Sequence, residues 1–126
     1  MIRIYGLKAH LDPIKAQLSD VINESMIEAL LYPDNKRAHR FFPMESEDFY
    51  SPEGRSGKYT VIEINLIEGR KVETKKKLIH SLFQKAEALG IEPIDLEITL
   101  TEQPAHNWGF RGMTGDEASL HYKIEV

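Results

Sequence analysis

Residues 59–89 contain two successive hydrophobic periods, which predict a strand followed by a helix. Apolar and polar positions alternate from residue 60 to residue 67, as in a strand with one buried face. Gly69 then allows a tight turn, and apolar residues return every three or four positions, as in an amphipathic helix. The core-facing positions are expected to be Ile62, Ile64, Leu66, Leu78, Ile79, Leu82, Phe83, Ala86 and Leu89.

The start of the chain shows the same order of elements. Residues 2–7 alternate and predict a short strand. Asp12 followed by Pro13 is typical of a helix start, because the carboxylate can accept a hydrogen bond from a free amide and proline has no N–H to leave unpaired. We expect this helix to run to about Leu31, where Pro33 ends it.

Other segments complete the predicted elements. Residues 37–42, 95–101 and 120–126 are expected to form three more strands. Residues 102–116 contain three glycines and the only tryptophan, Trp108. This composition predicts either a hairpin packed against a ligand or another subunit, or a structural hairpin that the tryptophan covers.

Strand, helix and strand therefore occur twice, and an α+β fold follows. We expect one domain of residues 1–126, with a first β-α-β unit at about 1–58 and a second at about 59–126. Each helix is long enough for a crossover, so the strands within a unit should run parallel. Together the units predict a four-stranded sheet with two helices on one face, plus short hairpin strands. The other face carries polar residues such as Glu63 and Asn65, and a partner subunit often covers such a face.

Composition and charge narrow the range of functions. The chain has 126 residues, a net charge of −4 and no cysteine. It therefore offers no global basic field for nucleic acid and no thiolate nucleophile or cysteine metal site. We expect no metal and no cofactor. No apolar run approaches the length of a membrane span and no signal peptide is visible, so a cytoplasmic protein is expected.

Arg70 is the first candidate binding residue. It lies where the predicted strand of residues 60–67 ends and the next helix begins. An arginine beside a helix N-terminus can hold an anion such as a carboxylate. The alternative is a surface ion pair with Glu68 or Glu73, which would carry no function.

A second group of cations precedes two phenylalanines in residues 36–42. Cations interleaved with aromatic rings suit an anionic or planar ligand. The alternative is an exposed basic edge strand, because edge strands are often charged. The residues in question are Lys36, Arg37, His39, Arg40, Phe41 and Phe42.

Three stretches carry a family resemblance. NLIEGRKVETKKKLI resembles the strand–turn–helix of the tautomerase superfamily, and TEQPAHNWGFRGMTGDEAS resembles its Thr-Glu strand end and aromatic-glycine hairpin. KRAHRFFPMESEDF resembles the equivalent segment of uncharacterised bacterial tautomerase-like proteins. The length and the doubled unit resemble the longer members, such as malonate semialdehyde decarboxylase and cis-3-chloroacrylic acid dehalogenase.

The resemblance implies a homotrimer and a small carboxylate substrate or ligand. Its chemistry uses an amino-terminal proline as general base or acid, arginines that hold the substrate carboxylate, and an aromatic residue from the hairpin as a pocket wall. Arg70 matches one of the arginines that hold the substrate carboxylate, and Trp108 matches the aromatic pocket wall. Phe110 and Arg111, on the same hairpin as Trp108, are further candidates for substrate binding. The proline position holds Ile2, whose size should also keep Met1 on the mature chain.

Two further family positions differ. The second substrate arginine of 4-oxalocrotonate tautomerase falls near Glu97, and the aspartate that helps the decarboxylase activate water falls near Lys36. Neither role is therefore matched.

Three functions follow from these observations. The first is a tautomerase-like isomerase of weak or altered activity, acting on a small enol, keto or unsaturated acid. Its base would be the Met1 amine, a histidine such as His39 or His106, or water. The second is a non-catalytic trimeric binding module that holds a small carboxylate metabolite. The third is an unrelated ferredoxin-like domain that acts as an interaction partner. The binding module would use Arg70, Arg37 and Arg40.

Overall fold

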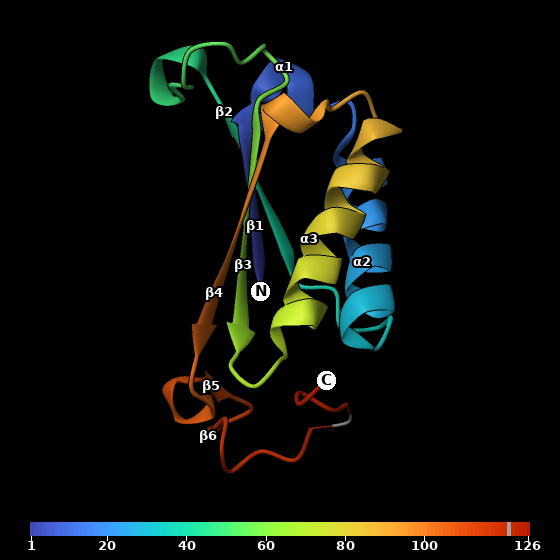
Figure 1. Cartoon of the computed structure of the whole chain (residues 1–126). Helices are drawn as coiled ribbons and strands as arrows, with labels where there is room; N and C mark the ends of the chain where they lie inside the picture. Colours follow the sequence, from blue (N-terminus) through green and yellow to red (C-terminus); the bar gives the residue numbers. More distant parts are fainter. Residues whose placement is uncertain (121) are drawn as a thin grey trace.

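Four strands form one mixed sheet in the order β2-β1-β3-β4 (Figure 1). The computed structural model describes residues 1–120 and 122–126. β1 (Ile2–Leu7) runs parallel to β2 (His39–Met44), and β3 (Thr60–Ile67) runs parallel to β4 (Leu96–Gln103). β1 and β3 are antiparallel neighbours at the centre. The parallel pairing expected within each β-α-β unit is confirmed.

Two long helices cover one face of this sheet (Figure 1). α2 (Lys15–Leu30) connects β1 to β2, and α3 (Val72–Glu87) connects β3 to β4. The helices lie side by side, and a hydrogen bond of 2.9 Å joins the hydroxyls of Ser25 and Ser81. In the described part of the chain, no helix is both long enough and apolar enough to cross a membrane.

Shorter elements complete the chain. α1 (Lys8–Leu11) follows β1, and three short 3-10 helices are η1 (Ser46–Asp48), η2 (Pro93–Asp95) and η3 (Ala105–Asn107). β5 (Gly109–Phe110) pairs antiparallel with β6 (Met113–Thr114), so the predicted hairpin is present.

The core lies between the sheet and the two helices. The predicted inner faces are confirmed most clearly on β3, where Ile62 and Ile64 are fully buried. Both β-α-β units contribute side chains to one hydrophobic core. The strands and the helices each bury one face, and these faces meet in the space between the sheet and the helices. Its large, fully buried aliphatic members are Ile4, Leu11, Leu18, Ile22, Leu30, Ile62, Ile64, Leu78, Leu82 and Ile91.

The start of the first long helix differs from the prediction. It begins at Lys15, because Asp12 instead ends α1 with its N–H bonded to the Lys8 carbonyl at 3.0 Å. The Asp12 carboxylate forms ion pairs with Lys8 at 2.8 Å and with Lys15 at 3.0 Å. A carboxylate held by two lysines is not available as a helix cap.

Two predicted strands also differ from the structure. The strand predicted at residues 37–42 lies two residues later, at His39–Met44. The strand predicted at residues 120–126 does not form among residues 120 and 122–126. That segment lies instead against the start of α3, where the Val126 carbonyl accepts a hydrogen bond from Thr74 Oγ1 at 2.7 Å.

The turn between β3 and α3 requires glycine. Gly69 has a φ of 138°, which side chains rarely adopt. A Cβ at this position would also lie 3.1 Å from the Ile124 side chain of the C-terminal segment. The turn therefore brings Arg70, the next residue, to the end of the sheet.

Asp95 ties the loop before β3 to the start of β4. Its carboxylate is buried and accepts hydrogen bonds from the Ser56 amide at 2.7 Å and from the Ser56 hydroxyl at 2.5 Å. The Ser56 hydroxyl and amide hold the pKa of Asp95 below its ordinary value of 3.8. The charged form is thus the one that stabilises the fold.

Replacing Asp95 by asparagine should lower the free energy of unfolding at pH 7 by about 1.5–3 kcal/mol, the usual contribution of hydrogen bonds to a charged group. The folded-state pKa lies below the unfolded one, so this stabilisation is complete above the unfolded pKa and disappears as the pH falls through the folded pKa. Urea unfolding at neutral and acidic pH should therefore show the difference from wild type shrinking on acidification. Asp34→Asn, at an exposed position, is the matched control. An Asp95→Asn difference that is independent of pH would contradict this account.

Candidate functional site

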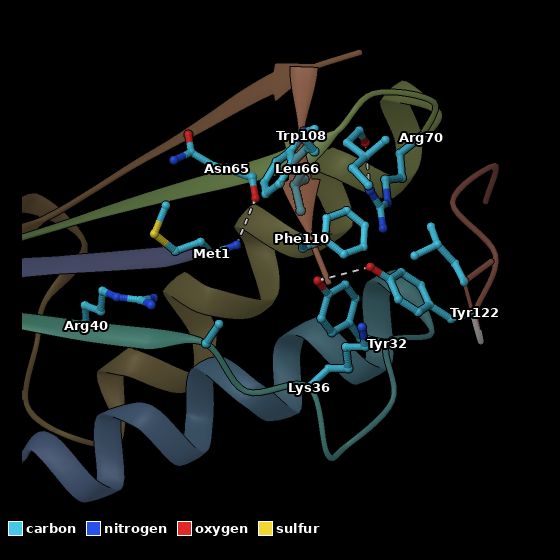
Figure 2. Close-up of a pocket in the computed structure, with 14 residues that line it drawn as sticks. Met1, Tyr32, Lys36, Arg40, Asn65, Leu66, Arg70, Trp108, Phe110 and Tyr122 are labelled. Atoms are coloured by element: carbon cyan, nitrogen blue, oxygen red, sulfur yellow. Dashed lines mark hydrogen bonds between the residues drawn. The ribbon is translucent and has the colours of Figure 1, made fainter. Parts of the chain in front are cut away.

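A pocket of about 360 Å³ opens at the end of the sheet where β1 and β2 begin and β3 ends (Figure 2). This position follows from topology, because the antiparallel pairing of β1 with β3 brings the start of one strand beside the end of the other. The chain start therefore meets the turn after β3. The loop after α2, the β5–β6 hairpin and the C-terminal segment supply the remaining walls.

The Met1 amine lies in this pocket and is held by one neighbouring residue. Its nitrogen donates to the Asn65 carbonyl at 3.1 Å, while the Met1 carbonyl accepts from the Asn65 amide at 2.9 Å. Burial, followed by the charges of Arg40, Arg3 and Arg70, lowers the pKa of this amine from 8.0 to about 6. Most of the amine is therefore neutral at pH 7 and has a free lone pair.

Arg70 lies in the same pocket and is only 6% exposed. Its Nη1 donates to the Ile67 carbonyl at 2.8 Å, whereas Nε and Nη2 are buried and have no partner among the described residues. Burial lowers its pKa. The alternative of a surface ion pair with Glu68 or Glu73 is wrong, because the side chain is buried and neither pair forms in the described part of the chain.

Nε and Nη2 form one edge of a guanidinium, and that edge can donate two parallel hydrogen bonds to a carboxylate. An unpartnered buried donor is costly, so native structures seldom keep one without a role. The free edge of Arg70 is consequently a place for an anion. No side chain caps the nearby N-terminus of α3, whose dipole also favours negative charge.

Two tyrosines face the same space. The Tyr122 hydroxyl donates to the Tyr32 hydroxyl at 3.4 Å, and the ring centroids are 4.8 Å apart. Burial raises the pKa of Tyr32 above its ordinary value of 10.0. Lys36 Nζ lies 5.5 Å from the centre of the Tyr122 ring. Tyr32 thus stays protonated at the pocket wall.

The hairpin contributes an aromatic wall, as predicted for a pocket-facing hairpin. Trp108 and Phe110 line the pocket. Trp108 Nε1 is buried and has no partner among the described residues. Arg111 has a φ of 56° and its guanidinium lies 5.0 Å from the Phe110 ring centre, but it is exposed and outside the pocket lining.

The charged side chains that line the pocket in the described part of the chain are all positive. Its described lining includes the Met1 amine, Lys36, Arg40 and Arg70, and it contains no Asp or Glu. Figure 2 shows Arg70 and Arg40 on opposite sides of Met1 and Asn65. This arrangement favours an anionic ligand. In the described residues no group of three or more His, Asp or Glu side chains could hold a metal ion.

The candidate bases His39 and His106 and the candidate binding residue Arg37 lie outside this pocket. His39 pairs with Ile2 across the sheet and so faces the helices, where its Nδ1 is 2.8 Å from Ser19 Oγ. Burial, then Arg37 and the terminal amine, lowers the pKa of His39 to about 4. Arg37 forms an ion pair with Asp20 at 2.7 Å on the surface.

Ile2, which the family resemblance aligns with a proline, makes two structural contributions. Its side chain is 2% exposed and belongs to the core. Its amide donates to the Ala38 carbonyl at 2.9 Å, which starts the pairing of β1 with β2. In this structure the nitrogen that faces the pocket is that of Met1.

Sequence reasoning missed the tyrosine pair. Tyr32 lies between the end of α2 and Pro33, and Tyr122 lies in a segment that the alternation assigns to a strand. An aromatic residue held between a helix end and a proline is the only signal that could have indicated Tyr32. Nothing in the local pattern indicates its contact with Tyr122, 90 residues away.

The chain is similar to known proteins in sequence and in fold. Residues 36–111 match the model of a family described as a tautomerase enzyme. A probable tautomerase of Ralstonia nicotianae is 43% identical over 54 residues, which are 42% of this chain and 77% of that protein.

Solved structures share the fold at lower sequence identity. Malonate semialdehyde decarboxylase superposes with a TM-score of 0.81 at 21% identity, over 90% of this chain and 92% of that one. Pt0534 gives 0.83 at 18% identity, over 94% and 98% of the two chains. The Q0 fused 4-OT, solved as a symmetric trimer, gives 0.79 at 22% identity, over 91% and 95%. These likenesses establish the expected α+β fold. The family match, which spans more than half of the chain, shows that the chain belongs to the tautomerase family.

Proposed function

We propose that the protein interconverts the keto and enol forms of a small carboxylic acid in the pocket that holds Met1 and Arg70. The observation that supports this most directly is the free Nε and Nη2 edge of a buried Arg70 in the same pocket as an amine of lowered pKa. One group binds the carboxylate and the other moves the proton. Family membership supports the same reaction class.

Arg70 would fix the substrate by its carboxylate. Two parallel hydrogen bonds orient the acid as well as bind it, which lysine cannot reproduce. The Met1 amine would then serve as general base, since a base works best when its pKa lies near the working pH. Burial keeps the amine neutral, and Arg40 adds to this effect by electrostatic repulsion of the protonated form.

A non-catalytic binding module is the second candidate. The observation that favours it is Ile2, which stands where the family has its proline and whose amide is used in the sheet. A primary amine would then be a weaker replacement, and the pocket would hold a small carboxylate without turnover. A turnover assay distinguishes the two functions, because only the isomerase would convert its ligand into product.

Ketonisation of phenylenolpyruvate should proceed faster with the protein than in buffer, using tag-free protein whose mass confirms Met1 as its first residue. The rate should rise as the pH increases through about 6, because the base must lose its proton. Arg40→Met removes a repelling charge, so it should raise the pKa of Met1 and move this rise to higher pH. Arg37→Met, a surface arginine outside the pocket, is the control. Folded protein without any rate increase would favour the binding module.

Arg70→Met should weaken malonate binding about 30- to 150-fold, the equivalent of about 2–3 kcal/mol for a lost charge-assisted pair. The fold should survive, since replacing a buried charge by an apolar side chain of similar length often costs little stability. Titration calorimetry and thermal unfolding measure the two effects, again with Arg37→Met as the control. Unchanged malonate affinity in folded Arg70→Met protein would place the carboxylate site elsewhere.

We also propose a homotrimer. The sheet face opposite the helices carries the stacked rings of Tyr5 and Phe42, 4.8 Å apart, and Phe42 is 39% exposed. Related fused 4-OT proteins are trimers. Light scattering at micromolar concentration should give about three times the chain mass of 14.5 kDa. A monomer under these conditions would exclude this assembly.

A further inference from the structure

The tyrosine pair has one hydrogen-bond donor to spare. Tyr32 and Tyr122 carry two hydroxyl hydrogens, and the single bond between them uses one. Because Tyr122 donates and Tyr32 accepts, the Tyr32 hydrogen remains available on the pocket side. In Figure 2 the two hydroxyls lie toward the space that the Met1 nitrogen also faces.

The local structure aims Tyr32 at the pocket. Leu31, which ends α2, adopts a left-handed conformation with a φ of 56°, and its amide donates to the Ile27 carbonyl at 3.0 Å. Such a conformation is unfavourable for a residue with a side chain. Pro33 then fixes the next turn. The strained residue directly before Tyr32 turns the chain away from the helix axis and toward the sheet end.

Tyr122 reaches the pair from the opposite end of the chain. The segment that carries it is fastened by the Thr74–Val126 hydrogen bond and by the contact of Ile124 with the Gly69 turn. The Lys36 amine over its ring adds a cation–π contact at 5.5 Å. Two segments far apart in sequence are therefore held so that their hydroxyls meet at the pocket.

We propose that Tyr32 is a further catalytic residue, which donates a hydrogen bond to the substrate oxygen that alternates between carbonyl and enol. Tyr122 is its positioning residue, because the bond it donates polarises and orients the Tyr32 hydroxyl. This inference rests on the proposed keto–enol chemistry. Arg70 binds the carboxylate, so Tyr32 acts on a different oxygen of the same substrate.

The reaction balances without any other reactant. In the enol-forming direction the Met1 amine removes a proton from the carbon next to the carbonyl. The electrons of that C–H bond form the new double bond, and the carbonyl electron pair moves onto oxygen. The ammonium returns the same proton to this oxygen. Tyr32 keeps its own hydrogen and stabilises the oxygen while it carries negative charge, as a donor in an oxyanion hole does.

The environment of Tyr32 suits a donor that is not itself ionised. Burial raises the pKa of Tyr32, so Tyr32 stays protonated over the whole range in which Met1 titrates. A group that keeps its proton can stabilise developing charge without competing as a base. The two groups thus have separate roles set by opposite pKa shifts.

Steady-state ketonisation of phenylenolpyruvate by wild type, Tyr32→Phe and Tyr122→Phe tests the assignment. Tyr32→Phe removes one oxygen and should lower kcat about 100-fold with KM nearly unchanged, as for loss of an oxyanion donor. Tyr122→Phe leaves Tyr32 in place and should lower kcat by a smaller factor, about 10-fold. Tyr50→Phe, at a position that is 86% exposed, is the matched control.

The outcomes separate this inference from the function it rests on. If wild type does not accelerate ketonisation, both are overturned. If wild type is active and Tyr32→Phe keeps kcat within twofold, or changes KM alone, only the role of Tyr32 is overturned. Should Tyr32→Phe fail to fold, Tyr122→Phe decides, since an unchanged kcat there would remove the proposed positioning and with it the polarised donor.

Discussion

The antiparallel pairing of β1 with β3 is the constraint on which the site depends. It places Ile2 opposite Ile64, so the residue before β1 lies beside Asn65 and near the end of β3. The Gly69 turn then puts Arg70 at the same edge of the sheet. Had the two units paired the other way, the chain start and the arginine would lie at opposite ends. The strand pairing therefore determines where the pocket lies and which residues can line it.

Burial of a guanidinium without a full set of partners has two linked effects. It leaves donors that only a ligand can satisfy, and it places positive charge near the Met1 amine. Removing either group from water is unfavourable, and the hydrophobic core between sheet and helices must offset that cost. A bound carboxylate would accept hydrogen bonds from the unpaired Arg70 donors. These donors therefore lower the stability of the ligand-free protein and favour binding of the ligand.

Periodicity predicts the sheet, the helices and their inner faces, because one-sided burial requires alternation in strands and three- to four-residue spacing in helices. Arg70 and Trp108, which the family motifs single out, both line the pocket. The burial of Arg70 cannot be predicted this way, since a charged residue after a glycine usually lies on the surface. The prediction of a strand around Tyr122 is wrong for a related reason. Alternation in a short segment does not show whether the edge of a sheet lies near enough to pair with it.

The same charge pattern also limits the chemistry. Water activation by a carboxylate needs an acid in the pocket, and the described lining has none. What remains is a neutral amine, a fixed carboxylate site and hydroxyl donors. Those groups suffice to move one proton between two atoms of a single substrate, which is what an isomerisation requires. A primary amine can serve as the base in this step, so these groups suit the proposed tautomerisation better than they suit a hydration.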